Sequence, residues 1–246
     1  MSSNNFTDIL KEISSSKTTI PCYAPSTKEE VNILPLTLAQ QKNIIETSID
    51  SSLAALFFNN TFFKILKQNI KGDISKYNTI DRVNFALHLR SQLQDSYTNG
   101  DIKVNIQDIL TKNKTVVYNL TPTNVTVDNF TFSLCIPDLL LDDKINSILI
   151  NKYKNENLNG AKLKNLISDL FVHEILKFTT KLKVNDKEVD LHNDFTNAAS
   201  LLEKIDSRMF LEVTKYINVV RDIERSYAML PGSNTNIDIV PDFFIV

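Results

Sequence analysis

Glycine is nearly absent from this chain. The 246 residues include four glycines, where average usage would give roughly 17. They lie far apart, at Gly72, Gly100, Gly160 and Gly232. Neither the phosphate-binding loop of nucleotide-hydrolysing proteins nor the glycine fingerprint of dinucleotide-binding folds can be built with this spacing. The sequence therefore excludes the enzyme classes that depend on those two loops.

Basic and acidic residues nearly balance, with 27 Lys and Arg against 29 Asp and Glu, for a net charge of −2. Such a balance supplies no overall field that would attract nucleic acid or an anionic membrane. The most basic stretch is residues 144–187, which has lysines but no arginine. Nucleic-acid sites usually add arginines and exposed aromatic residues. We therefore interpret these lysines as solvated, and keep a nucleic-acid-binding accessory role for residues 144–187 as the alternative function.

Targeting and redox signals are equally sparse. Residues 1–17 lack the basic start and long apolar stretch of a secretory signal. The longest apolar run, at residues 53–58, is far shorter than the roughly 20 residues that span a bilayer. Cys22 and Cys135 are too far apart for a C-x-x-C pair and are expected to be small buried side chains. We expect an intracellular, soluble chain without membrane contact.

Hydrophobic periodicity predicts helices in the first hundred residues. Thr37 and Gln40 form a capping-box pattern that opens a helix from Leu38 to about Asp50. A second helix covers residues 53–67. A third, capped by Asn78 or Thr79, covers residues 80–93 and is apolar on nearly all sides, which is typical of a buried helix. The preceding segments are predicted to be a short amphipathic helix at residues 6–13, an extended stretch at 20–27 and a short strand at 31–35.

Within residues 101–136, apolar residues recur at every second position instead of following the helical period. Strands are predicted at residues 102–106, 116–118, 125–127 and 130–134. Helices resume after Pro137, at residues 139–153, 163–178, 195–205 and 209–223, with a hairpin at 181–191. The stripe of the second of these helices includes Ile167 and Phe171, which we expect to be buried.

These predictions define an α+β fold, mostly helical, with a small antiparallel β insertion in the middle and an extended C-terminal arm. The expected organisation is an N-terminal arm (1–20), a helical N-terminal part (21–100), a β-rich insertion (101–137), a helical C-terminal part (138–230) and the extended C-terminal arm (231–246).

The three histidines do not form a recognisable site. His88 lies inside the apolar helix and is expected to be a hydrogen-bonded core or boundary residue. His173 begins a zinc-protease pattern, but Lys177 stands where the second histidine is required one turn later. His192 lies in a polar turn. We expect no metal ligand among them.

Acidic residues and nucleophiles give no stronger signal. Asp142 and Asp143 could hold a cation, but no further carboxylates follow at calcium-loop spacing, so we interpret them as solvated acids at a helix N-terminus. No nucleophile-elbow motif is present. We therefore expect no catalytic, cofactor-binding or metal-binding residues, no cofactor and no enzymatic activity. An enzyme of an unfamiliar type would need a deep polar pocket with convergent ionisable groups.

Two apolar segments point to partner binding instead. Four phenylalanines occur within residues 57–63, where they form either helix core or a contact surface. Residues 241–246 make an apolar arm that starts with a proline, and we expect that arm either to dock on its own core or to insert into a neighbouring protein. The predicted partner-binding residues are Phe57, Phe58, Pro241, Phe243, Phe244, Ile245 and Val246.

The order of elements resembles the baseplate hub subunit and hub assembly protein family of T4-type contractile-tailed bacteriophages. Four segments carry the resemblance: residues 24–37, residues 77–90, residues 171–176 with the hairpin at Asp186, and residues 210–220 before the final arm. Together they span most of the chain, from about residue 20 to residue 246.

This resemblance implies a non-catalytic role in building the hub at the tail tip. The implied partners are other baseplate or tail proteins in a hetero-oligomer. The implied location is the virion baseplate, the host cytoplasm during assembly, or both. Some family members carry paired cysteines that suggest a zinc ribbon in the middle region, but residues 104–134 contain no cysteine, so we expect no metal there.

Overall fold

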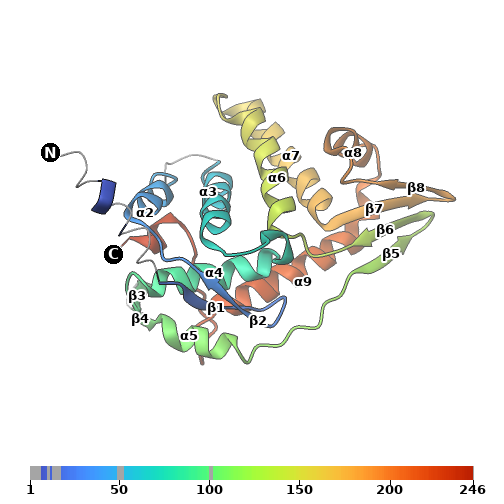
Figure 1. Cartoon of the computed structure of the whole chain (residues 1–246). Helices are drawn as coiled ribbons and strands as arrows, with labels where there is room; N and C mark the ends of the chain where they lie inside the picture. The colour runs from blue at the N-terminus through green and yellow to red at the C-terminus, as the bar shows by residue number, and fades with distance from the viewer. Residues whose placement is uncertain (1–6, 10–11, 13–17, 49–52, 100–101, 246) are drawn as a thin grey trace.

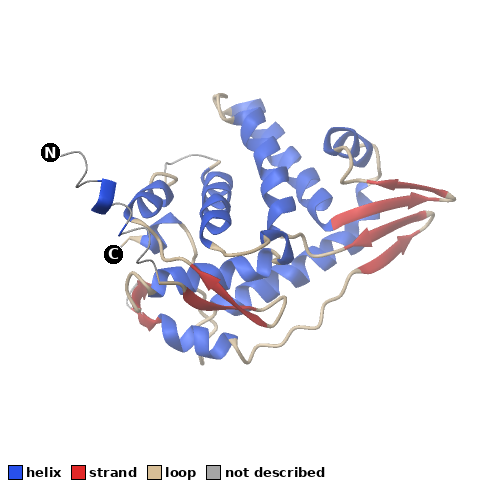
Figure 2. Cartoon of the chain, in the orientation of Figure 1, coloured by secondary structure: helices blue, strands red, loops and turns tan. Residues whose placement is uncertain are grey.

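The computed structural model describes residues 7–9, 12, 18–48, 53–99 and 102–245 (Figure 1). Helices dominate, and the described strands form small antiparallel sheets, so the fold class is α+β (Figure 2). The amphipathic helix predicted at residues 6–13 falls largely outside the described residues; of that segment, residues 7–9 and 12 are helical.

The N-terminal half begins with a hairpin and continues with helices. Its elements are β1 (Ile20–Ala24), β2 (Glu29–Ile33), α2 (Leu38–Ile45), α3 (Ala54–Asn69), the 3-10 helix η1 (Ile74–Lys76), α4 (Thr79–Ser91), the hairpin β3 (Ser96–Asn99) and β4 (Ile102–Asn105), and α5 (Ile106–Asn113). The capping box of α2 is confirmed. Gln40 donates its backbone N–H to the Thr37 hydroxyl at 3.2 Å, and the Gln40 side chain accepts from the Thr37 N–H at 3.0 Å.

Helix α4 is the central helix, as its sequence predicts. Asn78 caps it, and Asp81 completes a second capping box. Phe85, Leu87 and Leu89 are fully buried in a first hydrophobic cluster, which gathers side chains from β1, β2, α2–α5 and residues 230–244. Ile80, near the start of α4, belongs to a second cluster formed with α6–α9 and the larger sheet. The helix therefore joins the two clusters.

The C-terminal half contains the longest helices. Its helical elements are α6 (Leu139–Tyr153), α7 (Gly160–Phe178), α8 (Phe195–Leu202), the 3-10 helix η2 (Ser207–Phe210), α9 (Leu211–Ala228) and the 3-10 helix η3 (Pro241–Phe244). A third, smaller cluster lies where Leu53 and Leu56, at the start of α3, meet Leu149 and Tyr153 of α6.

The larger sheet combines two strands that precede α6 and α7 in the chain with two strands that follow them. Its order is β5-β6-β7-β8, from β5 (Thr123–Val127), β6 (Phe130–Leu134), β7 (Thr179–Val184) and β8 (Lys187–Asp190). Each neighbouring pair is antiparallel. The sheet is thus not confined to residues 101–137, because the hairpin predicted at 181–191 supplies half of its strands. Figure 2 shows these strands together at one end of the molecule.

Several local predictions were wrong. Val116–Tyr118 is not a strand, and Val116 and Tyr118 instead pack irregularly against the second cluster. Ile106 starts helix α5 rather than ending a strand, because Asn105 accepts the Gln107 N–H at 3.0 Å and caps the helix. Helix α2 ends at Ile45, earlier than expected. Ile167 and Phe171 of α7 are exposed by 59% and 51%, not buried.

Candidate functional site

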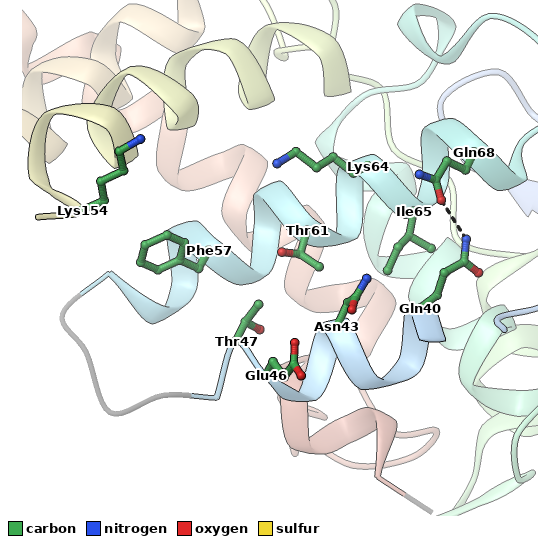
Figure 3. A pocket seen from close by; sticks show the side chains of 10 residues that line it. All are labelled: Gln40, Asn43, Glu46, Thr47, Phe57, Thr61, Lys64, Ile65, Gln68 and Lys154. Atoms are coloured by element: carbon green, nitrogen blue, oxygen red, sulfur yellow. Dashed lines mark hydrogen bonds between the residues drawn. The ribbon is translucent and has the colours of Figure 1, made fainter. Parts of the chain in front are cut away.

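A hollow of about 650 Å³ lies between α2 and α3 (Figure 3). Helix α2 contributes Gln40 and Asn43, and the turn after it contributes Glu46 and Thr47; helix α3 contributes Phe57, Thr61, Lys64, Ile65 and Gln68; and Lys154 follows the end of α6. We call this set the α2–α3 groove. It contains Phe57, one of the residues predicted to bind a partner.

The floor of the groove is one line of side chains on α3. Phe57, Thr61 and Ile65 are spaced four residues apart, so they lie one above the other on the same helix face. The adjacent side of α3 carries Phe58 and Phe62, which are exposed by 6% and 0% and stack with ring centroids 5.8 Å apart. The phenylalanine-rich segment is therefore divided. Phe58 lies in the core, whereas Phe57 is half-buried and faces the groove.

The two sides of the groove differ in charge. Lys64 and Lys154 lie along one side, and Glu46 lies on the other, as Figure 3 shows. One end is closed by Gln40, whose side-chain N–H donates to Gln68 Oε1 at 3.0 Å. Gln40 also completes the capping box of α2. Gln40 thus both stabilises the start of α2 and closes one end of the groove.

The position of Lys154 depends on a polar contact between α3 and α6. Asn60 Nδ2 donates to Asp143 Oδ1 at 2.7 Å and to Ser147 Oγ at 3.1 Å. Burial raises the pKa of Asp143, although the hydrogen bond from Asn60 favours its ionised form. Because this contact holds α6 against α3, it fixes the end of α6 beside the groove.

The C-terminal arm lies behind the groove, within the protein's own core. Phe243 and Phe244 are both 0% exposed. The Phe244 ring lies 5.6 Å from Phe62, and the Phe243 ring lies 5.0 Å from Tyr97, measured between centroids. Of the two arrangements open from the sequence, the structure has the arm on its own core. In this arrangement neither ring is available to a partner.

Two polar contacts hold the arm in place. Arg90 Nε donates to the Phe243 carbonyl at 2.6 Å, and Gln41 Nε2 donates to the Phe244 carbonyl at 2.7 Å. Beyond them, Ile245 is 50% exposed and Pro241 is half-buried. Val246 lies outside the described residues. Partner binding by Ile245 therefore stays a prediction, and the arm's two phenylalanines act as core residues that support α2 and α3.

A buried ion cluster lies where α4, α6 and α7 meet. Asp142 accepts from Arg82 Nη1 at 2.7 Å and pairs with Lys177 Nζ at 2.7 Å. Lys177 Nζ also donates to Asn146 Oδ1 at 2.7 Å. Asp142 is 5% exposed and Lys177 is 9% exposed. The interpretation of Asp142 as a solvated acid was therefore wrong, because cations from two other helices meet it inside the protein.

The pKa directions agree with a structural role for this cluster. Burial alone would raise the pKa of Asp142, but Lys177 and Arg82 outweigh it and hold the pKa at about 2. Nearby on α9, burial raises the pKa of Glu224, against the opposing effect of Arg82. Glu224 also lines a shallow hollow of about 350 Å³ with Arg221. This is where an enzyme hypothesis would have to be tested first.

The histidines make structural hydrogen bonds. His88 Nε2 accepts the Tyr23 N–H at 3.3 Å, and burial, reinforced by Lys114, lowers the His88 pKa to about 4. His88 is thus a hydrogen-bonded, half-buried histidine, the boundary case of the prediction. His173 Nδ1 lies 2.8 Å from the Asp169 carbonyl, and His192 Nε2 lies 2.9 Å from the Leu176 carbonyl. Within the described ranges, no three His, Cys, Asp or Glu side chains are grouped so that they could hold a metal ion.

The cysteines and the lysine-rich stretch also have structural explanations. Burial raises the pKa of Cys22 to about 12 and that of Cys135 to about 11, which disfavours the reactive thiolate. Four lysines of residues 144–187 pair with carboxylates: Lys152 with Asp169, Lys162 with Glu156, Lys177 with Asp142, and Lys181 with Glu188. These pairs reduce the positive charge that the stretch could offer to phosphates.

Comparisons of the chain with protein-family models, curated proteins and solved structures find no match. Among the helices that the structure describes, none is both long enough and apolar enough to cross a membrane.

Proposed function

We propose that this chain is a non-catalytic structural or assembly component of a contractile-tail baseplate hub, and that it acts by protein–protein contact. The hub part of the proposal comes from the order of the four sequence segments that resemble that family. The contact part comes from the α2–α3 groove. Baseplate or tail proteins are the proposed partners, in a hetero-oligomer located in the virion baseplate or in the host cytoplasm during assembly.

The observation that carries the proposal is the shape and lining of the groove. Phe57, Thr61 and Ile65 provide a partly apolar floor, and the line from Phe57 to Gln68 is about 16 Å long at the rise of an α-helix. That length matches about three turns of a partner helix laid along it. Amphipathic helices bind in such grooves through apolar residues spaced three and four apart. Lys64 and Lys154 would favour acidic residues on one flank of that helix.

Thr61→Arg is the sharpest test, because it places a long cation in the middle of the floor without removing a core side chain. Thr111→Arg is the matched control, since Thr111 is an exposed helical residue on α5. In the phage that encodes this chain, we expect Thr61→Arg to reduce the number of tails with complete baseplates at least tenfold, counted by electron microscopy. Thr111→Arg is expected to assemble normally.

Two results would contradict the proposal, and a third would identify a folding defect instead. Normal assembly with Thr61→Arg would show that the groove is not used. Intact tails after deletion of the whole gene would show that the protein is not needed to build the hub. Loss of assembly with both arginine variants would point to a general folding defect, which circular dichroism of the purified variants would reveal. Mass spectrometry of purified virions then decides whether the protein remains in the particle.

Removal of residues 240–246 is a poor test of partner binding. Such a truncation removes Phe243 and Phe244, which are completely buried. Failure of assembly would then reflect loss of the core beneath α2 and α3. Substitutions within the groove separate docking from folding more cleanly.

A further inference from the structure

The free edge of the larger sheet faces a second hollow. Strand β8 is the last strand in the order β5-β6-β7-β8, and helix α8 follows it in the chain. Between them lies a cleft of about 460 Å³. Its lining residues are Glu188, Val189, Asp190, Asn193, Asp194, Asn197, Ala198 and Leu201. We call it the β8–α8 cleft. In Figure 1, β8 and α8 lie at the opposite end of the molecule from α2.

The pairing of β8 with β7 determines which backbone groups face this cleft. Leu191 donates its N–H to the Thr180 carbonyl at 2.9 Å, and Leu182 stands opposite Val189 two residues further along. Because bonded and non-bonded pairs alternate in an antiparallel ladder, Val189 directs its N–H and C=O toward β7. Glu188 and Asp190 therefore direct theirs outward, toward the free edge. This is the arrangement that an added strand recognises.

The hydrophobic core is incomplete at this edge. Val189 stands opposite Leu182, which is 1% exposed, so both side chains are on the face of the sheet that packs against the helices. Val189 is nevertheless 43% exposed, and Leu201 of α8, on the other wall of the cleft, is 37% exposed. Ala198, between them, is 5% exposed. One apolar side chain placed in the cleft would extend the core over Val189 and Leu201.

The other face of β8 is acidic. Glu188 and Asp190 stand opposite Lys183 and Lys181 of β7, and Lys181 pairs with Glu188 at 2.8 Å. Strand β7 thus presents Lys-Leu-Lys to Glu-Val-Asp of β8. Asp190 accepts the His192 N–H at 2.8 Å and makes no ion pair with a described residue. Cations on the outer side of β8 would therefore meet Asp190, which no described cation pairs with, and Glu188, which Lys181 already pairs with.

We propose that the β8–α8 cleft binds an extended segment of a partner protein as a fifth strand. The segment has the pattern basic–apolar–basic that β7 already presents to β8. Its apolar side chain covers Val189 and Leu201, its basic side chains face Glu188 and Asp190, and its backbone pairs with the outward groups of those two residues. The proposal depends on the sheet edge alone, and failure of the groove variants would leave it unaffected.

The first test uses two synthetic peptides with the intact protein. One copies β7, Thr-Thr-Lys-Leu-Lys-Val, and the other replaces both lysines with glutamate. We expect the lysine peptide to bind at least tenfold more tightly in an NMR titration. At saturation, amide hydrogen exchange of Glu188 and Asp190 should slow at least tenfold, while that of Val189 stays unchanged. Equal affinity of the two peptides, absence of binding at millimolar concentration, or unchanged exchange at Glu188 and Asp190 would overturn the proposal.

Two variants then locate the site. Val189→Lys puts a cation into the cleft and should weaken binding of the lysine peptide at least tenfold. Val219→Lys on α9 is the control, since Val219 is 47% exposed and lies elsewhere, and should bind like the unmodified protein. Asp190→Asn keeps an oxygen for the His192 N–H, removes the charge, and should weaken binding about threefold. Full binding by Val189→Lys would exclude the cleft. If that variant does not fold, unchanged binding by Asp190→Asn would exclude it.

Discussion

Two contacts join distant parts of this chain, and they do so by different physical means. At one end, Phe243 and Phe244 pack beneath α2 and α3, so that the end of the described chain closes the first hydrophobic cluster. In the middle, Asp142 of α6 joins Arg82 of α4 to Lys177 of α7. The first contact is made almost entirely of aromatic rings, and the second of charges.

This difference determines what each contact is sensitive to. Buried rings stabilise in proportion to the apolar area they remove from water, and their contribution changes little with pH. A buried carboxylate between two cations contributes only while all three are charged, because losing one partner leaves an uncompensated charge inside the protein. The aromatic contact should therefore respond to changes in side-chain volume, and the ionic contact to changes in charge.

Truncation of the aromatic contact should have the largest effect. Phe244→Ala removes a ring that is 0% exposed and lies against Phe62, and leaves a cavity beneath α2 and α3. We expect the free energy of unfolding to fall by about 3–5 kcal/mol, measured by urea denaturation.

The neighbouring residue is the control for this prediction. Ile245 is 50% exposed, so Ile245→Ala should change the free energy of unfolding by no more than about 0.5 kcal/mol. A loss of less than about 1 kcal/mol for Phe244→Ala would mean that the arm is not part of the core, and would restore it as a candidate for partner binding.

The sequence predicts features that depend on near neighbours. The capping box of Thr37 and Gln40, the cap at Asn78 and the 15-residue helix from Leu139 to Tyr153 are as predicted, because each depends on residues within a few positions. The turn at residue 185 is also local. Asn185 has a φ of 53°, a left-handed conformation that asparagine tolerates well.

Contacts between distant segments could not be predicted in this way. Arg82, Asp142 and Lys177 come from three helices, and no spacing rule brings them together. Phe132 of β6 pairs with Leu182 of β7 across two intervening helices, which alternation alone does not indicate. The groove was missed except for Phe57. The polar Thr61, one turn after Phe57 on an otherwise apolar stretch of helix, could have indicated the open side, although Ile65 on the same line is only 3% exposed. Which side of that helix stays open depends on α2 and α6.

Neutralising the ionic contact should have the next largest effect. Asp142→Asn retains the shape of the side chain but removes the carboxylate that both Arg82 and Lys177 contact at 2.7 Å, and leaves Lys177 only the longer pair with Glu174 at 3.7 Å. We expect a loss of about 3 kcal/mol at pH 7, measured by the same denaturation. Asp108→Asn on α5 is the control, because Asp108 is exposed and its neutralisation should cost only a few tenths of a kcal/mol. Equal stability of Asp142→Asn and the unmodified protein would show that the cluster contributes no net stability.

A fall in pH should affect the ionic contact and leave the aromatic contact unchanged. The expected change in the free energy of unfolding is the smallest of the three. The pKa of Asp142 is lowered from 3.8 to about 2, so its contribution is complete above pH 4 and is lost as the pH falls through 2. This corresponds to about 2 kcal/mol. The stability difference between the unmodified protein and Asp142→Asn should therefore narrow by that amount between pH 4 and pH 2, whereas the difference for Phe244→Ala should stay constant.

A second titration occurs at higher pH but does not interfere. The pKa of His88 is lowered from 6.5 to about 4, so the folded state holds the imidazole neutral and loses stability as the pH falls from 6.5 to 4. Since His88 is present in all three proteins, this loss cancels when their curves are subtracted. Parallel curves for Asp142→Asn and the unmodified protein below pH 4 would mean that Asp142 is not held ionised by Arg82 and Lys177. The charged contact would then resemble the aromatic one in its response to pH.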